Sequence, residues 1–145
     1  MPQLMNWLYF ALLASASFGF YNFFSKLATD KFSASITLMF VAGTAFIVAA
    51  ITTFSLKTSG LPLQFSFKHI HLPILAGFAT GIAEILYFMA FAKGAPLSIG
   101  APFVIGTTII IASILGMIFL REPLSLLKSV GFLLTLSGLI LLAKS

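Results

Sequence analysis

The chain of 145 residues contains no cysteine and very little charge. Without cysteine it can form no disulfide, no thiolate metal site and no cysteine nucleophile. Charged residues make up 8% of the sequence, whereas an ordinary soluble domain has roughly 25%. Hydrophobic residues make up 60%, and the mean hydropathy is +1.14. This composition excludes an ordinary soluble domain and indicates an integral membrane protein.

The sequence also lacks any run of basic residues, although its formal net charge is +5. Such a charge on a soluble protein would suggest nucleic acid as a partner. Here the cations stand singly at the ends of apolar stretches. We therefore interpret them as membrane anchors and expect the lipid bilayer, not nucleic acid, as the surrounding partner.

Five stretches are long and apolar enough to cross a bilayer, which takes about 20 residues. We expect an all-α integral membrane protein with five transmembrane helices, in one domain over residues 1–145. The expected helices are at approximately residues 4–28, 34–56, 72–92, 97–120 and 125–143. No stretch shows the period-2 alternation of a transmembrane β-barrel. The first segment, MPQLMN, has no Lys or Arg, so we do not expect a cleaved signal peptide.

The loop charges show no bias between the two sides of the membrane. Each side holds four cations: Lys57, Lys68, Arg121 and Lys128 on one side, and Lys26, Lys31, Lys93 and Lys144 on the other. Such balance would permit insertion in both orientations. If Lys26 instead lies inside the first helix, a 4:3 bias remains and favours a single orientation. Both readings stay open.

Polar and small residues form a stripe along the first span. Ser15, Gly19, Asn22 and Lys26 follow the spacing i, i+4, i+7 and i+11, which places them on one face of a helix. Membrane helices associate through small residues and buried polar contacts. We therefore expect this face to meet protein or water and not lipid.

The third span carries an acidic residue, Glu84, in the apolar segment GFATGIAEILYFMAF (77–91). Gly77, Gly81, Glu84 and Phe88 share one helix face, and the two glycines form a GxxxG element. A charged acid near the bilayer midplane costs about 3 kcal/mol in lipid. Glu84 should therefore be protonated, paired or beside a cavity. It could exchange protons or bind a cation, or it could serve only helix packing, as a neutral acid or as a permanent partner of Lys26.

The fourth and fifth spans carry further candidates. In the fourth, Ser98, Pro102 and Gly106 recur at four-residue intervals, and Pro102 removes a helix hydrogen bond to the Ser98 carbonyl. The resulting kink is either a hinge in a cavity wall or a static bend. The small face of the fifth span consists of Gly131, Thr135 and Gly138. This face predicts a helix–helix seam, either within the subunit or between two subunits.

Two connections carry recognisable features. Residues 58–71 form the one long connection, which is amphipathic enough to rest at the membrane surface. His69 and His71 lie in it without a third ligand nearby, so we expect no metal there. Between the last two spans, we expect Pro123 in a first helical turn with Glu122 near the helix N-terminus, as a structural cap.

Three segments resemble the EamA domain of the drug/metabolite transporter superfamily. ILGMIFLREPLSLLKSVGFLLTLSGLILL is similar to its closing signature, with Glu122, Ser125, Gly131 and Gly138 in the matching places. FGFYNFFSKLA is similar to its first helix, and YFMAFAKGAPLSIGAP to its passage from the third helix to the fourth. Many members have two five-helix repeats of inverted topology. This chain resembles a single-domain, half-size member.

The resemblance implies a secondary transporter, not an enzyme, with no cofactor and no metal. Its substrate would be a small metabolite or an amphipathic or cationic compound. Two copies would form a homodimer, which the charge balance suggests is antiparallel, and would work by alternating access. A parallel dimer and pairing with a different half stay open. For so small a member, the resemblance implies the bacterial inner membrane.

The candidate residues fall into three groups. The substrate- or proton-binding candidates are Glu84, Asn22, Lys26, Ser15 and Tyr87. The hinge and cavity-wall candidates are Pro102, Gly106 and Ser98. The helix-packing or dimer candidates are Gly77, Gly81, Gly131, Thr135 and Gly138.

Two other functions remain open at this point. A translocase for a lipid or a lipid-linked sugar would use Lys26 or Lys93 to contact an anionic headgroup. A non-transporting scaffold or assembly subunit would use the polar stripes only for helix packing. An intramembrane enzyme is disfavoured, because the chain has no HExxH, no GxSxG and no second intramembrane acid.

Overall fold

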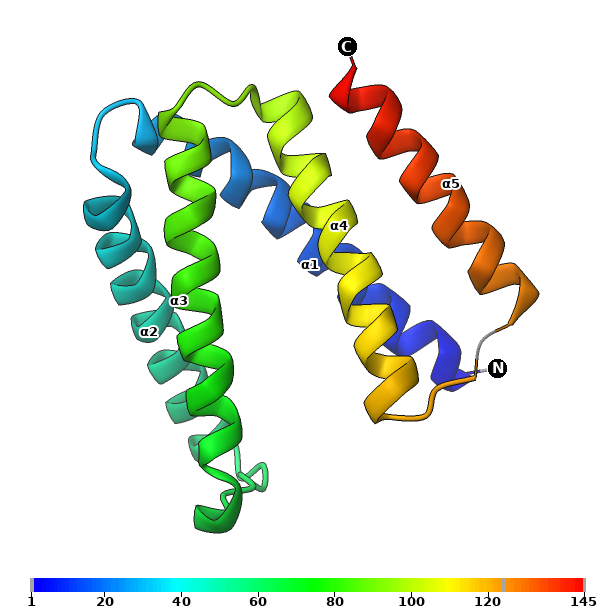
Figure 1. The fold of residues 1–145 in the computed structure, drawn as a ribbon. Helices are drawn as coiled ribbons and strands as arrows, with labels where there is room; N and C mark the ends of the chain where they lie inside the picture. The colour runs from blue at the N-terminus through cyan, green and yellow to red at the C-terminus, as the bar shows by residue number, and fades with distance from the viewer. Residues whose placement is uncertain (1, 124, 145) are drawn as a thin grey trace. The chain divides into compact units, whose positions relative to one another are not determined.

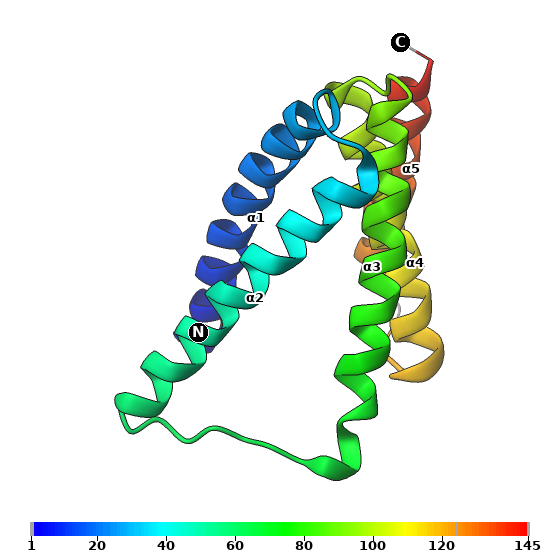
Figure 2. The same cartoon turned by 90° about the vertical axis from the view of Figure 1, so that its left-hand side faces the viewer.

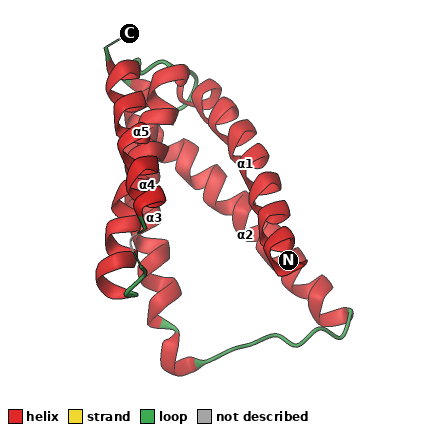
Figure 3. Cartoon of the chain, turned by 90° about the vertical axis from the view of Figure 1, so that its right-hand side faces the viewer, coloured by secondary structure: helices red, strands yellow, loops and turns green. Residues whose placement is uncertain are grey.

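A computed structural model describes residues 2–123 and 125–144, with side chains from residue 7 onward. The expected domain limits at residues 1 and 145 lie outside the described residues. The described chain consists of helices and loops, without a strand (Figures 1 and 3). Its elements are α1 (Pro2–Thr29), α2 (Ala34–Thr58), the short 3-10 helix η1 (Phe67–His69), α3 (His71–Ala92), α4 (Leu97–Phe119) and α5 (Leu126–Ala143).

The five α-helices confirm the expected membrane spans. Each is long and apolar enough to cross a bilayer, and the mean hydropathy of their most apolar windows runs from 1.2 to 2.2. Every observed helix end lies within two residues of the expected one. Large apolar side chains point outward along these helices, as Phe46 and Phe54 do on α2, because lipid and not water surrounds a membrane helix. The chain is a multi-pass integral membrane protein.

The helices group into two compact units, Met1–Lys93 and Gly94–Ser145. In the first unit, α3 packs against both α1 and α2. Among the described residues, the largest fully buried side chains are those of Phe88 and Phe91, which both lie on α3. Figure 2 shows α1 and α2 running away from α3 toward one end, where the long connection joins α2 to α3. The α1–α3 contact is therefore concentrated near the opposite end.

Two glycines in the left-handed conformation end helices of the first unit. After α2, Gly60 has φ 73°, its amide donates to the Lys57 carbonyl, and the Leu61 amide donates to the Leu56 carbonyl. This pair of bonds is the Schellman motif, which satisfies free carbonyls at a helix end. After α3, Gly94 has φ 96°. Glycine adopts these angles without the steric cost that a side chain would bring.

The second unit is the α4–α5 hairpin. Gly106 on α4 is buried, and a Cβ atom there would lie 2.8 Å from both terminal carbons of Leu139 on α5. The absence of a side chain at Gly106 therefore lets Leu139 approach the α4 backbone closely. Helix α4 continues through Pro102, whose side chain is exposed.

The turn between α4 and α5 corrects one detail of the expected cap. Helix α5 begins at Leu126, so Pro123 precedes the helix and does not occupy its first turn. Ser125 is the N-cap, and its hydroxyl oxygen accepts a hydrogen bond of 3.2 Å from the Lys128 amide. A serine oxygen satisfies a free amide at a helix start, which fixes the helix start after Ser125. The Glu122 carboxylate lies 3.9 Å from the Lys128 ammonium.

Candidate functional site: a polar seam between α1 and α3

Polar side chains of α1 and α3 meet along one line, which we call the α1–α3 seam. It consists of Tyr21, Asn22 and Lys26 on α1, and of Glu84 and Tyr87 on α3. Their contacts join residue 21 to 84, 22 to 87, and 26 to 91. Because both numbers rise together, the two helices run parallel, as the first and third spans of a serpentine chain must.

Glu84 lies in the seam with a phenol as its partner. The Tyr21 hydroxyl donates a hydrogen bond to Oε2 of Glu84. The carboxylate is half-buried and belongs to no ion pair within the described part of the chain. Oε1 accepts no hydrogen bond from any described residue. One carboxylate oxygen is thus held by α1, while the other is free to bind.

Asn22 and Tyr87 make the buried contact of the seam. The Tyr87 hydroxyl donates a hydrogen bond of 2.9 Å to Oδ1 of Asn22. Both side chains are buried, with exposed fractions of 9% for Tyr87 and 8% for Asn22. A hydrogen bond between membrane helices contributes about 0.6 kcal/mol on average and up to about 1.7 kcal/mol. This contact therefore ties the two helices together one turn along α3 from Glu84.

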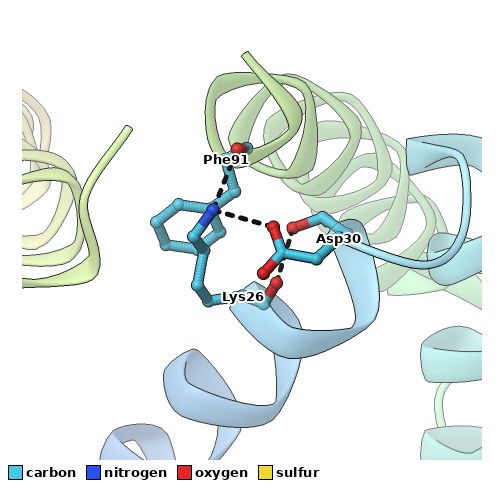
Figure 4. A network of polar contacts seen from close by, with 4 residues as sticks. Lys26, Asp30 and Phe91 are labelled. Atoms are coloured by element: carbon cyan, nitrogen blue, oxygen red, sulfur yellow. Dashed lines mark hydrogen bonds and ion pairs between the residues drawn. The ribbon is translucent and has the colours of Figure 1, made fainter. Parts of the chain in front are cut away.

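Lys26 closes the seam near the end of α1 (Figure 4). Its ammonium lies 3.0 Å from Oδ1 of Asp30 and donates a 3.3 Å hydrogen bond to the Phe91 carbonyl. It also lies 5.9 Å from the centre of the Phe91 ring, within cation–π range. Lys26 pairs with Asp30 and not with Glu84, so the hypothesis of a permanent Lys26–Glu84 ion pair was wrong.

Aromatic rings of α3 flank the polar atoms of the seam. The Tyr21 ring lies 6.4 Å from the Phe88 ring, and the Tyr87 ring lies 4.5 Å from the Phe91 ring. Phe88 and Phe91 are 0% and 1% exposed. Such packing fixes the rotamers of the polar side chains and lowers the local dielectric around them.

The structure brings together four of the five predicted binding residues, namely Asn22, Lys26, Glu84 and Tyr87. Ser15 does not join them, because it is exposed and its hydroxyl donates to the Ala11 carbonyl of its own helix. The hinge candidates Ser98, Pro102 and Gly106 belong to the second unit. Their part in a cavity wall stays a prediction.

The predicted packing glycines differ in their surroundings. A Cβ atom added at Gly77, Gly81, Gly131 or Gly138 would meet no atom within 4 Å. The Thr135 hydroxyl donates to the Gly131 carbonyl of its own helix. These faces therefore have no close partner in the described part of the chain, and their role in a dimer stays a prediction. Gly106, a hinge candidate, makes the close helix contact instead.

Sequence reasoning missed three residues of the site, namely Tyr21, Asp30 and Phe91. Tyr21 lies beside Asn22 and one residue off the predicted stripe, and a tyrosine inside an apolar span was the available signal. Asp30 follows Lys26 by four residues, the spacing of a helical ion pair. Phe91 contributes a backbone carbonyl, for which a sequence holds no signal.

The seam offers one carboxylate, one ammonium, two phenols and an amide within the membrane-spanning region. A carboxylate there can hold a proton or a cation, and phenol and amide groups can orient a polar ligand. No group of three potential metal-ligating His, Cys, Asp or Glu residues occurs in the described ranges. The rings of His69, at the end of η1, and His71, at the start of α3, lie 6.4 Å apart.

Comparison with known proteins gives one match. The model of the EamA-like transporter family matches residues 5–144. No curated protein and no solved structure matches the chain. The family match covers nearly all of the sequence and all five spans, and its members are drug and metabolite transporters. The chain belongs to the EamA-like transporter family.

Proposed function

We propose that this protein is a cation-selective secondary transporter that couples substrate movement to protons at Glu84. The single observation that carries this proposal is the half-buried carboxylate of Glu84, held at Oε2 by Tyr21 and free at Oε1. An acid inside a membrane span is expensive unless it is used or fully paired. Within the described chain Glu84 is only partly paired, which supports a binding role.

The charges around the seam favour a cationic substrate. Lys26 and Asp30 neutralise each other at 3.0 Å, so the remaining charged group of the seam is the Glu84 carboxylate. Proton and cation would compete for this carboxylate, which is the basis of an antiporter. The half-buried ring of Tyr21, next to Glu84, suits a cation through its aromatic face.

The alternative substrate class, a lipid-linked phosphate, needs a cation that is available to the headgroup. Lys26 already contacts Asp30 and the Phe91 carbonyl. Lys93 is exposed but lies beyond the end of α3, outside the seam. The seam therefore suits a cation better than a phosphate.

We further propose that two copies of the chain act together as an antiparallel homodimer. Alternating access in inverted-repeat transporters requires two halves of opposite orientation around a midplane site. This chain supplies one half, and the cations near its helix ends divide four against four between the two sides, or four against three when Lys26, which lies inside α1, is left out. In such a dimer, Glu84 would occur twice, once in each orientation.

The transport proposal is tested by uptake into proteoliposomes. The purified protein is reconstituted with an acidic lumen, and accumulation of a lipophilic aromatic cation is followed with and without a protonophore. We expect gradient-driven uptake that the protonophore abolishes. Amino acids and a polyprenyl phosphate serve as comparison substrates, and uptake of the polyprenyl phosphate alone would favour the translocase instead.

A scaffold is distinguished by the same ligand panel in a thermal-stability assay. A transporter is stabilised by its substrate through mass action. If no compound in the panel raises the unfolding temperature and none is transported, the transport proposal fails and the scaffold is favoured.

The antiparallel dimer is tested by topology. A cytoplasm-active reporter and a periplasm-active reporter are attached separately to the C-terminus after Ser145. Strong signals from both support insertion in two orientations. A signal from only one fixes the orientation and rules out an antiparallel dimer of identical chains.

A further inference from the structure

We propose that residues 61–68, in the connection between α2 and α3, form an in-plane anchor that binds anionic lipid headgroups. We call these residues the interfacial strip. The proposal concerns a surface apart from the α1–α3 seam and does not depend on transport.

Along the interfacial strip, large apolar side chains alternate with proline or polar side chains. The odd-numbered positions hold Leu61, Leu63, Phe65 and Phe67, and the even-numbered positions hold Pro62, Gln64, Ser66 and Lys68. In an extended backbone, successive side chains point to opposite sides. The connection runs extended between the ends of α2 and α3 in Figure 2, and Ser66 has the extended angles φ −138° and ψ 112°. The extended residues 61–66 therefore have an apolar face and a polar face, and Phe67 and Lys68 begin η1.

Contacts within the strip support this division into faces. The rings of Phe65 and Phe67, two residues apart, meet edge to face with their centres 4.8 Å apart. They therefore lie on the same side of the backbone. Both are strongly exposed, Phe65 at 70% and Phe67 at 80%. Two exposed neighbouring phenylalanines form an apolar patch, which is expected to contact another apolar surface.

The backbone of the strip limits how deep it can lie. The amides of residues 63–66 donate no hydrogen bond to any described residue. Free amides are not tolerated in the hydrocarbon core, because no water is present there to satisfy them. The strip therefore lies at the headgroup level, where water and phosphate oxygens accept from its amides while its apolar side chains enter the acyl boundary.

The positive charge around the strip favours anionic lipid headgroups. The strip contains Lys68, and Lys57, His69 and His71 lie close to its two ends in the sequence; at pH 7 the two lysines carry the positive charge. No acidic residue occurs between Asp30 and Glu84. Basic residues beside an interfacial apolar face attract anionic lipids. Apolar insertion and lysines with no acidic residue nearby in the sequence together fit an anionic bilayer surface better than a protein partner.

The depth of the strip is tested with single-tryptophan proteins. Trp7 is the only tryptophan of the chain, so Trp7→Phe gives a silent background into which Phe65→Trp or Gln64→Trp is introduced. The two positions are adjacent but lie on opposite faces. In vesicles containing lipids brominated near the headgroup, we expect blue-shifted emission and strong quenching at position 65. At position 64 we expect emission typical of water and weak quenching.

The headgroup preference is tested with the Phe65→Trp protein. Brominated phosphatidylglycerol and brominated phosphatidylcholine are compared at the same mole fraction in mixed vesicles. We expect the brominated phosphatidylglycerol to quench at least about twofold more strongly than the brominated phosphatidylcholine, because each basic residue enriches anionic lipid locally. The preference should disappear when Lys57, Lys68, His69 and His71 are all replaced by Gln. Should that variant fail to fold, high salt provides the same test by screening.

Three outcomes would overturn the proposal. Equal, water-like emission at positions 64 and 65 would place the strip in water. Blue-shifted emission without lipid quenching at position 65 would place Phe65 against protein, such as a second copy. Equal quenching by the two brominated lipids would remove the selectivity for anionic headgroups.

Discussion

The Tyr21 hydroxyl on α1 donates a hydrogen bond to Oε2 of Glu84 on α3. This bond joins Glu84, the one acidic residue within the five described membrane-spanning helices, to a neighbouring helix. Because Tyr21 orients one carboxylate oxygen, it acts as a positioning residue for the proposed proton and cation site.

Tyr21→Phe should slow transport while leaving the helices packed. The change removes only the hydroxyl, and a membrane hydrogen bond of about 0.6 to 1.7 kcal/mol corresponds to roughly three- to eighteenfold in an equilibrium. We expect a fall in uptake rate within that range, measured in proteoliposomes. Tyr9→Phe is the matched control, since Tyr9 is exposed on the same helix. Full uptake by Tyr21→Phe would remove the phenol from the site.

Replacing Lys26 should destabilise the first unit more than replacing Asp30. Asp30→Asn removes an ion pair between residues four apart on a helix, worth about 0.5 kcal/mol. Lys26→Gln also removes a charged hydrogen bond to the Phe91 carbonyl on α3, so we expect about 1 to 2 kcal/mol. Thermal unfolding in detergent measures both. Equal losses would mean that the contact to α3 contributes nothing.

Gly106→Ala should destabilise the α4–α5 hairpin. The added Cβ would lie 2.8 Å from two carbons of Leu139, and overpacking of this kind costs about 1 to 3 kcal/mol. Leu139→Ala in the same chain should recover part of the loss, because the clash is then gone. Gly138→Ala is the control, with no atom within 4 Å of its added Cβ. Equal thermal stability of the Gly106 and Gly138 variants would contradict the close approach.

Gly131→Ile should weaken self-association without unfolding the hairpin. A Cβ atom added at Gly131 meets no atom within 4 Å in the described chain, so we expect the main effect outside the subunit. If the α5 face forms the dimer seam, the bulk of Ile keeps two helices apart. Energy transfer between labelled copies in vesicles measures association. Unchanged energy transfer between the labelled copies would mean that this face of α5 contacts lipid and not a second copy.

The sequence alone predicted the five helices, because length and hydropathy are set by the thickness of the bilayer. The ends of α2 and α4 came within two residues of their observed positions for this reason. The start of α5 came within one residue of its predicted position, but Pro123 lies before the helix and not in its first turn, because Ser125 is the N-cap. Hydrogen bonding at a helix start depends on local angles that hydropathy does not report.

The site was predicted in part, and the missing part depends on helix rotation. Asn22 and Lys26 were found because they share a helix face, and Glu84 because an acid in a span is costly. Tyr21 was missed because α1 is turned so that Tyr21 and Asn22 both meet α3. Ser15 lies on the predicted stripe yet stays exposed, because α1 diverges from α3 toward its N-terminus (Figure 2). Packing between helices sets how each helix is rotated and how far two helices diverge. The sequence periodicity of a single helix does not report either quantity.

Proton-coupled uptake by Glu84→Gln tests the central claim most directly. Glutamine keeps the size of the side chain and its hydrogen bond from Tyr21 but cannot release a proton. Glu122→Gln is the matched control, because Glu122 is the other glutamate of the chain and lies exposed in the α4–α5 turn. The account predicts that Glu84→Gln assembles normally but loses pH-dependent uptake, while Glu122→Gln retains it. Normal pH-dependent uptake by Glu84→Gln would show that Glu84 serves only the packing of α1 against α3.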